Sequence, residues 1–134
     1  MAHYAFLDEN NIVTEVITGV DENVTQTDLD GTEVGGSTEA WETFYGNFRG
    51  KVCKRTSYNT INGTHKNGGE PFRHTFANIG CFYNEELDKF KPLQPYPSWI
   101  FDEISYNWNA PVLKTEGAHY WSEENLNWMT VITE

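Results

Sequence analysis

The chain has 134 residues, a formal net charge of −11, and an aromatic content of 15%. This length fits one domain with a useful core, and the negative charge argues against sequence-specific DNA binding, because DNA-binding surfaces are basic. No apolar run approaches the roughly 20 residues needed to cross a bilayer, and the N-terminus has no basic-then-apolar signal pattern, so we expect a soluble protein of cytoplasmic origin with no membrane partner.

The charge is unevenly distributed along the chain. Residues 1–48 contain ten acids and no Lys or Arg, residues 49–91 contain eight bases and four acids, and residues 92–134 contain six acids against Lys114. The basic stretch of Arg49, Lys51, Lys54 and Arg55 has two interpretations. It can contact an anionic partner surface, or it can neutralise the acidic N-terminal third, and the second is the simpler of the two.

The first elements predicted in chain order are a hairpin and a loop. In residues 2–20, an alternating run with Tyr4 and Phe6 is joined by the polar turn Leu7-Asp8-Glu9-Asn10-Asn11-Ile12 to a β-branched run. Residues 21–36 are acidic, Thr-rich and nearly free of aromatics, which indicates a loop with room for a short strand.

One short helix is predicted over residues 38–45. Ser37 is suited to the N-cap, Glu39 to the first turn near the positive end of the helix dipole, and Gly46 to the C-terminal stop. We expect this helix to pack Trp41, Phe44 and Tyr45 on the sheet.

The middle of the chain predicts one strand, one loop and a second hairpin. Residues 51–58 alternate as a strand, residues 59–71 hold two Asn-Gly steps typical of a long exposed loop, and residues 76–91 fit a hairpin. Cys53 and Cys81 have neither a metal-ligand nor a redox spacing, so we expect two separate buried thiols.

One eight-residue phrase occurs three times: an aromatic, a short polar residue, a Glu, four more residues and a second aromatic. Its copies are Tyr83-Asn84-Glu85 to Phe90, Phe101-Asp102-Glu103 to Trp108, and Trp121-Ser122-Glu123 to Trp128. Asn, Asp and Ser favour tight turns through bonds to the backbone, so each copy predicts a β-hairpin with its aromatics facing each other. The Glu is expected to be a solvated turn residue.

Three prolines in Pro92-Leu93-Gln94-Pro95-Tyr96-Pro97 predict a boundary, because they stiffen the chain and remove hydrogen-bond donors. We expect a β-rich main body over residues 1–91 and a Pro-hinged arm of two hairpins over residues 92–134. The expected fold class is mainly β, built of antiparallel hairpins in a small sandwich or barrel-like sheet, with one short helix.

Candidate chemistry is sparse. Neither the acids nor the four histidines have the spacing of a carboxylate couple or a zinc site, and no nucleophile triad or nucleotide fingerprint occurs. Asp28-Leu29-Asp30-Gly31-Thr32-Glu33 resembles the start of a calcium loop but lacks its distal Glu and flanking helices, which leaves at most a weak surface site. We therefore expect no enzyme activity, no cofactor and no bound transition metal.

The arm contains four of the five tryptophans, Trp99, Trp108, Trp121 and Trp128. Three interpretations are open: they anchor a protein interface, they stack on sugars, or they only stabilise the hairpins. Trp99 and Trp121 packed against protein would favour an interface, and a coplanar exposed row would favour sugar binding.

Several segments in a fixed order resemble a known family. They are Thr56-Ser57-Tyr58-Asn59-Thr60, Ala77-Asn78-Ile79-Gly80-Cys81-Phe82-Tyr83 and Gln94-Pro95-Tyr96-Pro97-Ser98-Trp99, with the opening Met-Ala-His and the final Tyr-Trp-x-Glu hairpin. Over nearly the whole chain this pattern resembles small proteins of marine tailed bacteriophages, including cyanophages. The resemblance implies a phage origin and a place in the virion, and it transfers no catalytic or ligand residue.

Together these observations predict a non-enzymatic virion structural protein, made in the host cytoplasm. A capsid decoration or cement subunit is the favoured role, ahead of a minor tail or fibre component. Its expected partners are other capsid or tail proteins, with a second copy of the chain as a further option. The alternative function is a carbohydrate-binding module for adhesion to the host surface.

Overall fold

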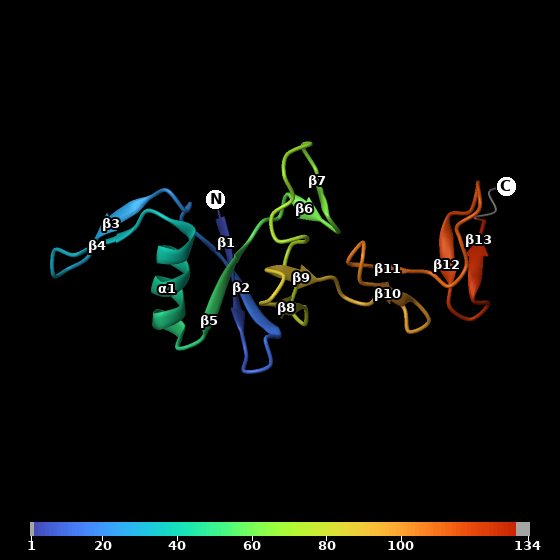
Figure 1. Ribbon diagram of the computed structural model, residues 1–134, viewed down its shortest axis with the longest axis horizontal. Helices are drawn as coiled ribbons and strands as arrows, with labels where there is room; N and C mark the ends of the chain where they lie inside the picture. Colours follow the sequence, from blue (N-terminus) through green and yellow to red (C-terminus); the bar gives the residue numbers. More distant parts are fainter. Residues whose placement is uncertain (1, 131–134) are drawn as a thin grey trace. The chain divides into compact units, whose positions relative to one another are not determined.

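The computed structural model describes residues 2–130 and is mainly β (Figure 1). These residues form one three-stranded sheet, five two-stranded hairpins and one helix. These sheets are small and unclosed, so the expected mainly β fold of antiparallel hairpins with a single short helix is confirmed, and no closed barrel forms within residues 2–130. Most of the strands span two or three residues and offer too little edge for wider pairing.

The chain divides into two compact units, unit 1 (Met1–Leu93) and unit 2 (Gln94–Glu134). The prolines predict a boundary after residue 91. Each unit is described below by itself.

Unit 1 is built on the antiparallel sheet β2-β1-β5. Strand β1 (Ala2–Leu7) is central and pairs with β2 (Val13–Gly19) and β5 (Val52–Thr56). The polar turn between β1 and β2 forms because Asp8 Oδ1 accepts hydrogen bonds from the backbone N–H groups of Asn10 and Ile12. The first hairpin is therefore confirmed together with its turn chemistry.

The side chains of β1 alternate between two hydrophobic cores. Tyr4 and Phe6 pack with Trp41 of the helix on one side of the sheet, whereas Ala5 and Leu7 pack with a cluster that includes Phe90 on the other side. Figure 1 shows the helix along one side of the sheet and β8 and β9 towards the other. Both faces of β1 are buried, which makes this strand the centre of unit 1.

The helix α1 (Thr38–Arg49) begins as predicted and ends later. Ser37 is the N-cap and accepts a hydrogen bond from the Ala40 N–H, but the left-handed residue that ends the helix is Gly50, with φ 68°. Gly46 is buried inside the helix, where a Cβ atom would lie 2.8 Å from the Lys51 carbonyl oxygen. Close approach of the backbone, rather than helix termination, therefore explains Gly46.

Two regions predicted as loops contain short hairpins. Strands β3 (Thr25–Thr27) and β4 (Glu33–Gly35) pair within the acidic stretch, and β6 (Thr60–Ile61) pairs with β7 (Thr64–His65). Pairs of two or three residues have too short an alternating pattern to be recognised in a sequence.

The three repeated phrases form three hairpins with the predicted register. These are β8 (Phe82–Asn84) with β9 (Lys89–Lys91), β10 (Ile100–Asp102) with β11 (Asn107–Asn109), and β12 (Tyr120–Ser122) with β13 (Asn127–Met129). The two aromatics of each phrase are directly opposite each other, at ring-centroid distances of 5.1, 5.1 and 5.4 Å. The expected facing of the aromatics is confirmed.

The turns of the three hairpins are also equivalent. The side chains of Asn84, Asp102 and Ser122 each accept a hydrogen bond from a backbone N–H of the loop that follows. The sixth residue of each phrase adopts a positive φ, 53° at Asp88, 59° at Tyr106 and 48° at Leu126. The repeat is therefore a unit of backbone conformation as well as of sequence.

Candidate functional site

The candidate site is built around tryptophans of the arm, which form a packed cluster in unit 2. The Trp99 ring lies 6.0 Å from that of Trp121 and 5.9 Å from that of Trp128, and the last two lie 5.4 Å apart. All three pairs are edge-to-face, with interplanar angles of 86°, 63° and 72°. Trp121 is only 5% exposed, so this cluster serves as the core of unit 2.

Glu123 connects this cluster to the proline-rich segment. Its carboxylate accepts hydrogen bonds from the Ser98 N–H at 3.0 Å, the Ser98 hydroxyl at 2.6 Å and Trp121 Nε1 at 2.9 Å. These bonds, those of the Ser98 and Trp121 side chains first, lower the pKa of Glu123 below its ordinary value. The expectation of a solvated turn Glu fits the exposed Glu85 and Glu103 and is wrong for Glu123.

An open groove of about 510 Å³ lies beside the cluster, entirely within unit 2. Its lining includes Trp99, Trp108 and Trp128, together with the loop residues Leu113 and Lys114. Trp128 is tied to the loop because its Nε1 donates a hydrogen bond to the Val112 carbonyl at 2.9 Å. Lys114 Nζ lies 5.5 Å from the centroid of the Trp128 ring, which places one cation at an aromatic wall.

The groove brings together three of the four tryptophans expected to bind a partner, Trp99, Trp108 and Trp128. Trp121 lies behind it in the cluster. Sequence reasoning missed Leu113, which is 88% exposed at the groove, because nothing in a polar loop distinguishes one Leu as a lining residue.

The four basic residues expected to bind a partner lie elsewhere, in unit 1. Arg49 makes a two-point contact with Glu15 at 3.1 and 3.2 Å, and Arg55 lies 3.4 Å from Glu22. Lys51 donates to the Thr14 hydroxyl at 3.2 Å, and Lys54 Nζ lies 5.5 Å from the centroid of the Tyr83 ring. Both carboxylates belong to the acidic N-terminal third, as the neutralisation interpretation expects.

Sequence reasoning also missed a buried ion pair between Glu42 of α1 and Arg73. Arg73 Nη1 lies 2.5 Å from Glu42 Oε2 and also donates to the Arg55 carbonyl at 2.9 Å, and its Nε lies 2.8 Å from Asp88. Burial lowers the pKa of Arg73, but Glu42 and Asp88 raise it by more. Helical spacing places Glu42 with Trp41 and Gly46 on the buried side of α1. An acidic residue on the buried side of a helix is the sequence signal that could have identified this pair.

The calcium-like segment forms the turn between β3 and β4. Asp28 and Asp30 each accept a hydrogen bond from a backbone N–H of that turn, from Leu29 and Thr32 respectively. Over residues 2–130, no group of three or more His, Cys, Asp or Glu side chains is placed to hold a metal ion. Cys53 and Cys81 are free and buried, as expected, and burial raises the pKa of both thiols, to about 12 for Cys53.

The helix of the described part of the chain is too short to cross a bilayer. Comparison with known proteins finds no matching family model, no similar curated protein and no similar solved structure.

Proposed function

We propose that the protein is a non-enzymatic structural component of a tailed-phage virion, and that it attaches to a neighbouring virion protein through the tryptophan-lined groove of unit 2. A decoration or cement role on the capsid is favoured over a minor tail or fibre role. The observation that carries the proposal is the groove itself, which is open, aromatic and supported from behind by a packed core.

This arrangement suits a protein anchor because interface energy is concentrated in a few Trp, Tyr and Arg side chains held in rigid pockets. Trp128 is fixed by its bond to the Val112 carbonyl and by its edge-to-face contact with Trp121. Little side-chain freedom is therefore left to lose on binding. Leu113, 88% exposed, adds apolar area that a partner could cover.

The ring geometry disfavours the carbohydrate-binding alternative. Sugar stacking uses exposed aromatic faces arranged in a row, whereas Trp99, Trp121 and Trp128 meet edge-to-face and Trp121 is buried. The packing of Trp99 and Trp121 against other protein groups is the outcome that favours an interface.

The charge distribution supports a location on a particle surface. Residues 1–48 carry ten acids and no Lys or Arg. If this part faces solvent, its like charge discourages association between particles, while the groove is directed to the shell.

The proposal is tested with purified particles of the phage that encodes the chain. Quantitative mass spectrometry of virions banded in a density gradient should find the chain at a fixed ratio to the major capsid or tail protein, and cryo-electron microscopy should locate it on that protein. A chain that is abundant in infected cells but absent from banded particles would refute the proposal. Binding of the pure protein to host-surface glycans, without particle association, would favour the alternative.

A further inference from the structure

The three-stranded sheet of unit 1 has two edge strands, and side chains close the β5 edge. The Arg55 backbone N–H donates to Glu42 Oε2 at 2.6 Å, and the Arg55 carbonyl accepts a hydrogen bond from Arg73 Nη1 at 2.9 Å. Both backbone groups of Arg55 therefore point away from the central strand β1. An unpaired strand edge is a template for pairing with another chain, so these bonds protect the β5 edge from such pairing.

The direction of these groups fixes which residues point outward on the opposite edge strand, β2. Along an antiparallel pair, residues that exchange hydrogen bonds alternate with residues that do not. Since Arg55 is opposite Tyr4 and points away from it, the backbone of Tyr4 points to β2, where it pairs with Ile17. Val16 and Thr18, on either side of Ile17, therefore direct their backbone N–H and carbonyl groups away from the sheet.

The open part of the β2 edge is bounded at both ends. At one end, Val13 exchanges backbone hydrogen bonds with residues 80–81, as donor at 2.9 Å and as acceptor at 2.8 Å. At the other end, the Val20 N–H donates to a tyrosine hydroxyl at 3.2 Å. Within the described residues 2–130, the outward backbone groups of Val16 and Thr18 have no hydrogen-bond partner.

The open part of β2 lacks the features that usually protect a strand edge. The strand Val13–Gly19 contains no Pro or Lys, and five of its seven residues are β-branched, which suits an extended partner. Its bulge lies at Thr14, before the open part. Its one charged side chain, Glu15, is held by Arg49 at 3.1 and 3.2 Å.

We propose that the open stretch of β2, residues 15–19, pairs antiparallel with the same stretch of a second copy of the chain. A two-fold axis at Ile17 places Val16 of each copy opposite Thr18 of the other. Outward backbone groups then meet outward backbone groups, and each of these two pairs exchanges both of its hydrogen bonds. The two three-stranded sheets become one continuous sheet.

The occupant is a second copy because the open stretch is its own complement in this register. Val16 meets Thr18 and Ile17 meets its own copy, which are β-branched cross-strand pairs that stabilise strand pairing. Glu15 lies opposite Gly19, so no like charges are opposed. Val16 and Ile17 are half-buried at the rims of the two cores of unit 1, and the second copy covers apolar surface that they expose.

Existing contacts exclude the neighbouring registers. An axis one residue earlier would bring Gly19 of one copy to Val13 of the other, whose outward groups are already bonded. An axis one residue later would pair Val16 with Val20, whose N–H is already donated to a tyrosine hydroxyl. The arrangement centred on Ile17 uses the open backbone groups and none of the occupied ones. It shares no residue with the groove of unit 2, so this inference and the proposed function can fail independently.

The first experiment measures self-association of the full-length chain by sedimentation equilibrium up to about 1 mM, a range that covers the weak dimer expected of a short interface. Salt at about 0.5 M screens the repulsion between copies of net charge −11. A monomer–dimer equilibrium is expected. Thr18→Pro should raise the dissociation constant at least about tenfold, because it removes an outward N–H that the single chain does not use. Thr18→Val keeps that N–H and is the matched control, with the constant unchanged.

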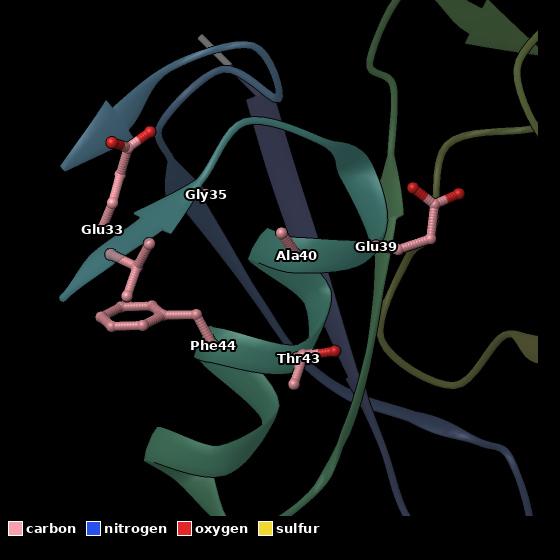
Figure 2. Close-up of a pocket in the computed structure, with 7 residues that line it drawn as sticks. Glu33, Gly35, Glu39, Ala40, Thr43 and Phe44 are labelled. Atoms are coloured by element: carbon pink, nitrogen blue, oxygen red, sulfur yellow. The ribbon is translucent and has the colours of Figure 1, made fainter.

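Figure 2 shows another open surface of unit 1, a depression of about 430 Å³ between β4 and α1 with Ala40 and Phe44 in its lining. It shares no residue with β2 and provides a control surface. Thr43→Glu, which places a charge at this depression, should leave the dissociation constant unchanged. A dimer weakened by Thr43→Glu and not by Thr18→Pro would refute pairing through β2.

Cysteine crosslinking tests the register. Oxidation of Ile17→Cys should give a disulfide-linked dimer, because the Cα atoms of a non-hydrogen-bonded pair lie about 4.5 Å apart, within the span of a disulfide. Thr18→Cys should crosslink at least about tenfold more slowly, since residue 18 of one copy is opposite residue 16 of the other. The native thiols are buried and give little background. A chain that stays monomeric, or faster crosslinking at residue 18 than at residue 17, would overturn the proposal.

Discussion

At the scale of single residues, Glu123 is the member of its repeat that departs from the pattern. Glu85 and Glu103 occupy the same position and remain exposed, whereas Glu123 accepts three hydrogen bonds from Ser98 and Trp121. The Glu123 carboxylate accepts hydrogen bonds from protein donors in place of water, and it thereby joins two segments that are distant in sequence. The tryptophan cluster therefore depends on the ionised form of one side chain.

This dependence predicts an acid-sensitive unit 2. The folded pKa of Glu123 lies below its ordinary value of 4.5, so its ionised form stabilises the fold above that pH, and the contribution is lost as pH falls through the lowered pKa. Tryptophan fluorescence should therefore change as the pH is lowered through this acidic range. Glu123→Gln should reduce the change and leave unit 2 less stable at pH 7, whereas the exposed neighbour variant Glu124→Gln should behave as the wild type. An identical fluorescence change at acidic pH in all three proteins would contradict this stabilising role of Glu123.

The buried pair of Glu42 and Arg73 predicts a large stability effect. Their side chains are only 8% and 10% exposed, so removing one partner leaves a buried charge uncompensated. Glu42→Gln or Arg73→Met should lower the free energy of unfolding by about 3–5 kcal/mol, and the double variant should lose less than the sum. Urea unfolding followed by the helical circular dichroism signal measures unit 1, which contains α1. Additive losses would show that the pair is not coupled.

Residue roles were predictable only where a local pattern decides them. Ser37 as N-cap follows from its position before a helical run, and the turn side chains Asn84, Asp102 and Ser122 follow from their short polar groups. Glu123 and Arg73 depend on partners distant in sequence, Ser98 and Glu42. No spacing rule identifies such partners.

At the scale of elements, the three repeated hairpins share their strand register and an unusual turn conformation. Asp88, Tyr106 and Leu126 all have φ near 50–60°, a region that non-glycine residues rarely adopt. Asp tolerates it through local hydrogen bonds, and Tyr106 is buried, so burial can offset the strain. Leu126 is 51% exposed and has neither advantage.

The third hairpin can therefore be stabilised by one substitution. Leu126→Asn should raise the free energy of unfolding of unit 2 by about 0.5–1 kcal/mol, because Asn adopts the left-handed region at lower cost. Thermal unfolding followed by tryptophan fluorescence gives the value. Leu126→Ala, which removes the same apolar side chain but keeps the backbone strain, is the control and should not stabilise. A loss of stability in the Asn variant would show that the Leu side chain has a packing role.

The elements themselves were predictable where the sequence pattern is long or repeated. The opening hairpin, the start of α1 and the three aromatic hairpins all follow from alternation, capping and repetition. The later helix end was missed because Gly is the residue type that most often ends a helix. Gly46 instead lies inside α1, where its backbone packs closely against the Lys51 carbonyl. The β3–β4 and β6–β7 pairs are too short to show a period.

At the scale of the whole molecule, the basic residues and the aromatic groove belong to different parts of the chain. Arg49, Lys51 and Arg55 contact acidic and polar groups of the N-terminal third and Lys54 lies on the Tyr83 ring, whereas the aromatic groove belongs to unit 2. The sequence indicated the tryptophans as a set, but their division into three groove residues and one buried residue depends on how the hairpins pack. In this account, partner binding belongs to the groove and not to the basic stretch.

The most direct test measures how much of each variant enters phage particles. Leu113→Ser changes an exposed groove residue outside the packed tryptophan cluster, and Ile104→Ser, in the same unit and 97% exposed, is the matched control outside the groove. Mass spectrometry of banded particles should find Ile104→Ser at wild-type occupancy, and Leu113→Ser and Trp108→Ala reduced at least about tenfold while still folded in solution. Wild-type occupancy of both groove variants would contradict the central claim and would direct attention to Arg49, Lys51, Lys54 and Arg55.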